Sequence, residues 1–242
     1  MSGHSKWSTI KRDKEKTDQA RGKIFTKLGK EIAVAVKAGG PDPVNNPKLA
    51  TIIAKARSNN MPNDNIQRSI KKASGEGSAV NYEEMTYEGY GPGGSAIICD
   101  ILTDNKNRAS SDVRHIFDRA GGALGGPGSV AFLFDRKAVV ATKPKAGLTE
   151  DDVMMIAMDA EADDYDFSEE GYTFVGEATK LATIRDKILS AGLEVVSAEL
   201  EMIAQQTMDL PDDKYTSFMK MLDNLEENED VQNVYHNVNL KD

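Results

Sequence analysis

The chain has 242 residues, of which 39% are hydrophobic and 29% are charged. This composition is typical of a globular protein and excludes a fibrous or wholly disordered chain, and no apolar run reaches the roughly 18 residues that a membrane span requires. Cys99 is the only cysteine, which excludes an internal disulfide and a cysteine-based zinc site. Because the first seven residues lack the apolar core of a secretory signal, we expect a cytoplasmic protein without a membrane partner.

The net charge of −9 is distributed unevenly along the chain. Residues 1–75 contain 16 Lys and Arg against 6 Asp and Glu, a net charge of +10, so the other residues together carry −19. A basic segment joined to acidic domains is typical of a protein that binds nucleic acid at one place. Chance clustering of the basic residues is the alternative.

The N-terminal third is predicted to be helical. Residues 1–20 contain few large apolar side chains, and we expect an arm that becomes ordered on binding. A helix is predicted from Gly22 to about Gly39, with apolar residues on one face and lysines on the opposite face. A second helix begins at Asn46-Pro47 and a third extends from about Asn63 to Gly75. Together they predict a three-helix domain.

Strands are predicted after the small-residue linker that begins at Gly75. Residues 85–90 and 95–102 form a predicted hairpin around the glycine-rich turn 91–94. The polar stretch 103–108 follows the hairpin and precedes a helix that contains Val113 and Phe117. The glycine-rich loop 121–128 ends this helix.

The remaining elements predict a second α+β unit. The order is strands 130–134 and 138–142, a helix 149–161, strands around 165 and 172–175, a helix 178–191 and a strand 195–202. From strand 138–142 onward the order is βαββαβ, which predicts a ferredoxin-like fold. A helix with Phe218 and Leu225 and a strand with Val231 are left over, and we expect them to return and complete the middle domain.

The N-terminal segment contains the candidate nucleic-acid-binding residues. Dense cations suit phosphates, and an exposed aromatic ring can stack on a base. The alternative is a solvated charged face in which Trp7 anchors the arm to a core. The candidates in this segment are His4, Lys6, Trp7, Lys11, Arg12, Lys14, Lys16, Arg21, Lys23, Lys27 and Lys30.

Lys106 and Arg108 are further candidates, because they lie where a strand leads into a helix and free N–H groups favour an anion. Ordinary helix capping by Asp104 or Asn105 is the alternative, although capping does not explain the two cations. The loop 121–128 contains five glycines, which indicates either close approach of its backbone to another group or a mobile connection. The turn 91–94 lacks the features of a phosphate-binding loop.

A search for catalytic groups finds no nucleophile with a base and no pair of carboxylates in a predicted cleft. The histidines His4, His115 and His236 have no metal-ligand spacing. We therefore expect no enzymatic activity, no cofactor, no metal and no small-molecule substrate. An enzyme that uses an acidic cleft between domains is the disfavoured third class.

Several long motifs in this order closely resemble the YebC/PmpR family, which includes the mitochondrial translational activator of a cytochrome oxidase subunit. The resemblance extends from residue 3 to the C-terminus. The motifs that carry it are Gly3-His4-Ser5-Lys6-Trp7, Arg21-Gly22-Lys23-Ile24-Phe25-Thr26-Lys27-Leu28, Tyr87-Glu88-Gly89-Tyr90-Gly91-Pro92-Gly93-Gly94, Thr103-Asp104-Asn105-Lys106-Asn107-Arg108 and Gly128-Ser129-Val130-Ala131-Phe132-Leu133-Phe134.

The resemblance implies a multidomain α+β fold in which a ferredoxin-like domain is inserted into the middle domain. We expect boundaries at 1–75 for the helical domain, 80–128 plus 206–242 for the middle domain, and 129–205 for the ferredoxin-like domain. It also implies a DNA-binding transcriptional regulator, with a ribosome-associated translation factor that binds rRNA as the alternative. The oligomeric state stays open between a monomer and a weak dimer.

Overall fold

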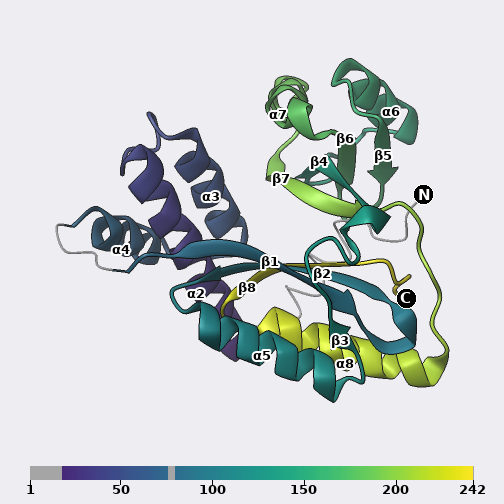
Figure 1. The fold of residues 1–242 in the computed structure, drawn as a ribbon. Helices are drawn as coiled ribbons and strands as arrows, with labels where there is room; N and C mark the ends of the chain where they lie inside the picture. Colours follow the sequence, from purple (N-terminus) through teal and green to yellow (C-terminus); the bar gives the residue numbers. More distant parts are fainter. Residues whose placement is uncertain (1–17, 76–79, 242) are drawn as a thin grey trace. The chain divides into compact units, whose positions relative to one another are not determined.

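The computed structural model describes residues 18–75 and 80–241. Contact density divides them into two compact units: Asp135–Ile203 form one unit, and the other described residues form the second. The second unit contains a three-helix domain and an α+β middle domain, and the first is a ferredoxin-like domain inserted into the middle domain (Figure 1). The predicted fold class is therefore confirmed, whereas the exact three-part boundaries stay a prediction.

Three helices, α2 (Asp18–Gly39), α3 (Pro47–Ser58) and α4 (Asn63–Ser74), form the N-terminal domain around one apolar core. The Asn46 side chain accepts a hydrogen bond from the N–H of Leu49 at 3.1 Å and so caps α3, as predicted. Its amide nitrogen also donates to the carbonyl oxygens of Ala35 and Gly40 at 2.8 and 2.9 Å. One buried asparagine thus starts α3 and fixes it to the end of α2.

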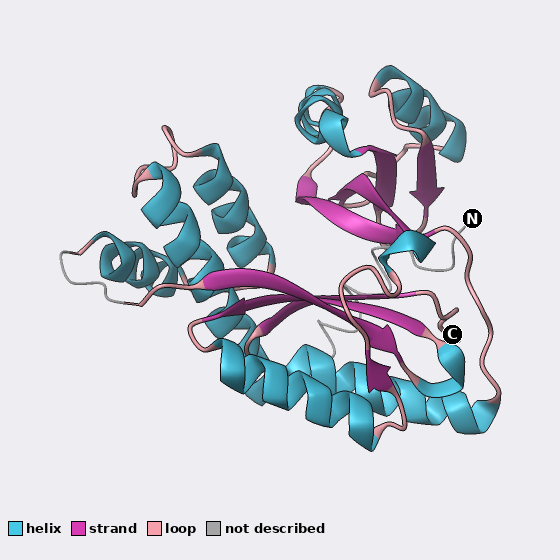
Figure 2. Ribbon diagram, viewed as in Figure 1, coloured by secondary structure: helices cyan, strands magenta, loops and turns pink. Residues whose placement is uncertain are grey.

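The middle domain is a four-stranded antiparallel sheet of order β3-β1-β2-β8. Its helices α5 (Lys106–Arg119) and α8 (Asp212–Glu227) lie side by side on one face of the sheet (Figure 2). The predicted hairpin is confirmed, and the C-terminal helix and strand do return to this sheet. The strands are β1 (Glu83–Tyr90), β2 (Ala96–Thr103), β3 (Ala123–Leu124) and β8 (Val231–His236).

The inserted domain has the strand order β5-β6-β4-β7, which is the order of a ferredoxin-like sheet. Helices α6 (Glu150–Asp159) and α7 (Leu181–Ser190) pack on its apolar face. A short 3₁₀ helix, η3 (Ala178–Lys180), precedes α7. The strands are β4 (Phe134–Thr142), β5 (Asp164–Phe167), β6 (Tyr172–Glu177) and β7 (Val195–Ala204).

The predicted strand at residues 130–134 is wrong. Ala131–Leu133 form a 3₁₀ turn, η2, and one continuous strand, β4, begins at Phe134. The physical reason is that the N–H groups of Val130 and Ala131 bind the Glu88 carboxylate and are not available to a strand ladder. A second 3₁₀ turn, η1 (Pro92–Gly94), forms the hairpin turn between β1 and β2.

Candidate nucleic-acid interface

Three candidate lysines of α2 contact the middle domain. Lys23 forms an ion pair with Glu227 at 3.2 Å, and the Lys27 ammonium donates to the carbonyl oxygen of Glu226. Lys30 forms an ion pair with Asp230 at 2.7 Å and is itself only 9% exposed. The face of α2 that carries these lysines packs against the end of α8 and the start of β8, and a role of the three lysines in binding nucleic acid stays a prediction.

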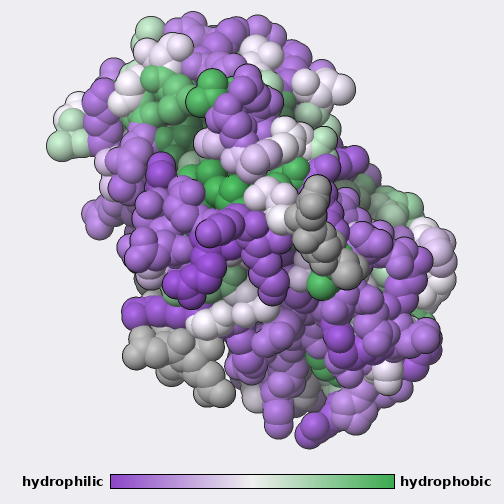
Figure 3. Space-filling view, turned by 90° about the vertical axis from the view of Figure 1, so that its left-hand side faces the viewer, coloured by the Kyte–Doolittle hydropathy of each residue, from purple (hydrophilic) through white to green (hydrophobic). Residues whose placement is uncertain are grey.

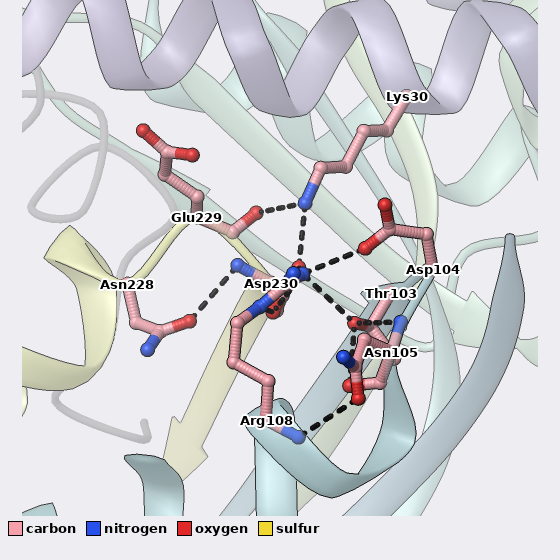
Figure 4. Close-up of polar contacts among 8 residues, drawn as sticks. All are labelled: Lys30, Thr103, Asp104, Asn105, Arg108, Asn228, Glu229 and Asp230. Atoms are coloured by element: carbon pink, nitrogen blue, oxygen red, sulfur yellow. Dashed lines mark hydrogen bonds and ion pairs between the residues drawn. The ribbon is translucent and has the colours of Figure 1, made fainter. Parts of the chain in front are cut away.

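Buried Asp230 is the centre of an ion cluster that we call the Asp230 cluster, formed by Lys30, Arg108 and Asp230 (Figure 4). The Arg108 guanidinium donates from Nε and Nη2 to the two Asp230 oxygens at 2.9 to 3.0 Å. Burial raises the pKa of Asp230, but the hydrogen bonds and charges of Lys30 and Arg108 lower it by more, so this pKa lies below that of an ordinary aspartate. The cluster joins α2, α5 and β8.

The turn before α5 has a capping role. The Asn105 side chain accepts a hydrogen bond from the N–H of Arg108 at 3.1 Å, and the Thr103 hydroxyl accepts one from the N–H of Asn105 at 3.0 Å. Asp104 does not cap the helix but pairs with Arg108 at 2.7 Å. Of the two capping residues considered, Asn105 is the one that caps.

Lys106 and Arg108 also have partners within the chain. Lys106 forms an ion pair with Glu83, and Arg108 binds Asp104 and Asp230. The anion beside the start of α5 is thus a carboxylate of this protein, Asp230. A phosphate site at these two residues stays a prediction, and it would have to displace existing ion pairs.

Of the other N-terminal candidates, the structure describes only Arg21. Arg21 is exposed on α2. His4, Lys6, Trp7, Lys11, Arg12, Lys14 and Lys16 lie outside the described residues. Their predicted role in binding therefore stays a prediction.

Helix α4 presents a basic surface that the sequence analysis missed. Ile66, Ile70 and Ala73 are buried in the core of the helical domain. The other side of the helix exposes Arg68, Lys71 and Lys72, which we call the α4 basic face. The spacing of apolar residues in α4 could have predicted this surface. Cations at i, i+3 and i+4 that lie opposite an apolar stripe share one exposed side of a helix.

The cations of the α4 basic face have no carboxylate within ion-pair distance among the residues that the structure describes. In this they differ from Lys23 and Lys30. Figure 3 views the molecule from the side on which α3 and α4 lie in Figure 1 and shows mostly hydrophilic residues, with hydrophobic ones gathered toward the top. Exposed Arg57 at the end of α3 adds another cation to the helical domain.

The acidic charge lies in the other domains. The unit Asp135–Ile203 contains 7 Lys and Arg against 16 Asp and Glu, a net charge of −9. An anionic polymer would be attracted to the helical domain and repelled by this unit. The described basic and acidic charge thus lies in different parts of the chain.

Three other features of the described residues concern metal binding, the Cys99 thiol and membrane spans. Residues 18–75 and 80–241 contain no group of His, Cys, Asp and Glu side chains arranged to hold a metal ion. Cys99 is buried in β2, and burial raises the pKa of its thiol well above the ordinary range. No described helix combines the length and apolar character that a membrane span needs.

A three-helix domain joined to an α+β domain that carries an inserted ferredoxin-like domain defines the structural class of this protein. The sequence model of the TACO1/YebC protein N-terminal domain matches residues 5–76, and that of the TACO1/YebC second and third domain matches residues 82–238. The chain therefore belongs to the TACO1/YebC family.

Relatives and a solved structure agree with this assignment. A probable transcriptional regulatory protein from Clostridium botulinum (strain Okra / Type B1) is 52% identical over 98% of this chain and 96% of the relative. A protein of the same name from Acetivibrio thermocellus is 51% identical over 98% of both chains. The crystal structure of a conserved hypothetical protein from Aquifex aeolicus has a TM-score of 0.83 and 38% identity, and the match covers 92% of each chain.

Proposed function

We propose that this protein is a nucleic-acid-binding regulator of gene expression that acts on DNA through its helical domain. The observation that carries the proposal is the α4 basic face, whose three cations are exposed and have no carboxylate partner among the described residues. Lys and Arg side chains of this kind neutralise phosphates and release counterions, which supplies most of the affinity for nucleic acid.

Three further observations support DNA as the target. The relatives from Clostridium botulinum and Acetivibrio thermocellus are named probable transcriptional regulatory proteins. Helices α3 and α4 are joined by the four residues 59–62, a connection of the length used in helix-turn-helix proteins. Exposed Gln67 and Arg68 on α4 carry the donors that read base edges in a major groove.

A second candidate function is that of a translation factor that binds rRNA in the ribosome. Lys71 and Lys72 of the α4 basic face favour it, because lysine ammonium groups bind phosphates regardless of sequence and suit a folded RNA recognised by its shape. The acidic unit Asp135–Ile203 would stay away from the RNA by repulsion. Neither candidate function requires a catalytic group.

The test reverses the charge of the α4 basic face. We expect the Arg68→Glu/Lys71→Glu/Lys72→Glu variant to lose at least about tenfold in affinity for DNA or rRNA, and the plot of log affinity against log salt to flatten by about 2 to 3 units, because three phosphate contacts are lost. Fluorescence anisotropy with a labelled duplex DNA and a labelled rRNA fragment measures both quantities. These residues are a better choice than Lys23, Lys27 and Lys30, whose reversal would also break contacts within the protein.

The matched control is the Arg114→Glu/Arg119→Glu/Lys220→Glu variant, which changes the net charge equally at exposed positions of the middle domain. It should bind nearly as tightly as the wild type. Equal losses in the two variants would mean that only net charge matters and would contradict the proposed site. Co-sedimentation of the wild type with ribosomal particles at low salt, lost in the α4 variant, would favour the rRNA candidate over DNA.

A further inference from the structure

The segment between the glycine-rich loop and β4 is held by one carboxylate. Glu88 of β1 accepts hydrogen bonds from the N–H groups of Gly128, Val130 and Ala131 at 2.9, 3.0 and 2.9 Å. Glu88 is only 9% exposed, so these are charge-assisted bonds in a largely dry environment. The backbone of residues 128–131 is therefore fixed against the sheet, and we call it the clamped turn.

The glycine-rich loop 121–128 is packed closely against β1. A Cβ atom at Gly122 would lie 2.4 Å from the carbonyl oxygen of Tyr90, and one at Gly125 would lie 2.3 Å from the Ser129 hydroxyl. The N–H of Gly125 also donates to the carbonyl oxygen of Glu88 at 2.8 Å. Of the two interpretations of this loop, close approach of the backbone applies, and a mobile connection does not.

Two exposed aromatic residues contact or follow the clamped turn, Tyr90 at the end of β1 and Phe132 in η2. Phe132, the second residue of η2, is 65% exposed, although Val130 two residues earlier is fully buried. Tyr90 is 40% exposed, and its hydroxyl donates to the carbonyl oxygen of Ser129 in the clamped turn at 3.1 Å. Phenylalanine is among the residues most often buried in proteins, and here a fixed backbone holds the ring in water.

We propose that Tyr90 and Phe132 form a stacking site for unpaired bases of a nucleic acid. The proposal rests on the proposed function and adds to it the kind of nucleic acid that is bound. Bases that are not paired expose flat π-faces, and proteins bind them by stacking on aromatic side chains beside a backbone-binding surface. A rigid platform favours this binding because little conformational entropy is lost when a base stacks on it.

The surroundings of the two rings leave room for flat bases. The carboxylate of Glu88 is covered and its charge is stabilised by three N–H groups, so it does not present a bare negative charge to a phosphate. The neighbouring residues Gly125, Gly126, Pro127 and Gly128 are all exposed and carry no long side chains. A base can therefore approach the segment without displacing bulky groups.

The experiment uses the full chain and a short single-stranded RNA that carries one 2-aminopurine, whose fluorescence falls when it stacks. The control ligand is the same strand annealed to its complement. We expect Phe132→Ala to bind the single strand about tenfold more weakly and to abolish the fluorescence change, whereas its affinity for the duplex stays the same. Phe132→Trp should restore both signals, and Tyr90→Leu should weaken single-strand binding like Phe132→Ala.

The Phe132→Leu variant distinguishes base stacking from an apolar protein contact at this position. Leucine keeps an apolar side chain but cannot stack, so the variant should behave like Phe132→Ala. Single-strand binding at the wild-type level in Phe132→Leu or Phe132→Ala would overturn the stacking site and point to an apolar protein contact. If these variants bind like the wild type while the α4 variant has lost affinity, the stacking site fails and the proposed function stands; if the wild type binds no nucleic acid, both fail.

Discussion

Replacing Asp230 with alanine will lower the free energy of unfolding by about 3 to 5 kcal/mol, the cost of breaking a buried ion pair by removing one partner. The Asp230 side chain is 4% exposed and the Lys30 side chain 10%, so the substitution leaves a lysine ammonium buried without its counterion. Of its two hydrogen-bond acceptors beside β8, the Lys30 ammonium would keep only the carbonyl oxygen of Glu229, at 2.9 Å. Urea unfolding of the full chain, followed by circular dichroism, measures the loss.

The matched control for Asp230 is Glu227→Ala. Glu227 also pairs with an α2 lysine, Lys23, but the two side chains are 58% and 33% exposed. Exposed pairs of this kind contribute about 0 to 1 kcal/mol, so this variant should unfold nearly like the wild type. A loss in Asp230→Ala no larger than that in Glu227→Ala would contradict a structural role of the Asp230 cluster.

The Asp230 cluster also predicts a pH dependence. The folded protein lowers the pKa of Asp230, so the unfolded state binds its proton more tightly than the folded state does. The resulting stabilisation is fully present above the ordinary aspartate pKa of about 4 and is lost as the pH falls through the lower folded value. Asp230→Ala should therefore lose less stability on acidification than the wild type.

The second large effect is expected for Glu88→Ala, which should lower the free energy of unfolding by about 3 kcal/mol because three backbone N–H groups lose a charged acceptor. Burial raises the pKa of Glu88, but the hydrogen bonds from Gly128, Val130 and Ala131 lower it by more, so the carboxylate stays charged at neutral pH. Hydrogen exchange at these three amides should become faster in the variant.

Glu84→Ala is the control for Glu88. Glu84 lies on the same strand, β1, but its side chain is 69% exposed and its nearest cation, Lys48, is 4.0 Å away. We expect almost no change in stability or in exchange at residues 128–131. Protection of those amides that survives in Glu88→Ala would mean that the clamped turn is held by other contacts.

The elements with local signals were predictable from the sequence. Asn46-Pro47 marks the start of α3. The asparagine side chain accepts a hydrogen bond from a free N–H of the first turn, and the proline has no N–H that needs an acceptor. Thr149 similarly caps α6, and the apolar period of α8 identified its buried face. These signals depend on residues within a few positions of each other, so one sequence suffices to recognise them.

The partners of charged residues were not predictable in the same way. Lys30 and Asp230 are 200 positions apart, and only the fold brings the end of the chain beside α2. The sequence alone placed these lysines on the face of α2 opposite its apolar residues and did not reveal their partners. Glu88 likewise acts on residues about 40 positions later, and its hydrogen bonds hold strand-forming residues in a segment where Ala131–Leu133 form a 3₁₀ turn.

The chain passes between the middle domain and the inserted domain at two places that lie next to each other, which matters for domain deletion and domain exchange. The chain leaves the middle domain after Phe134 and re-enters it at Ala204, and beside these points the N–H of Gln205 donates to the carbonyl oxygen of Leu133 at 2.9 Å. Because exit and entry points are in direct contact, a short linker can replace the whole excursion without stretching the remaining fold. The ferredoxin-like domain is thus a detachable module, and the same junction would accept a different domain as a graft.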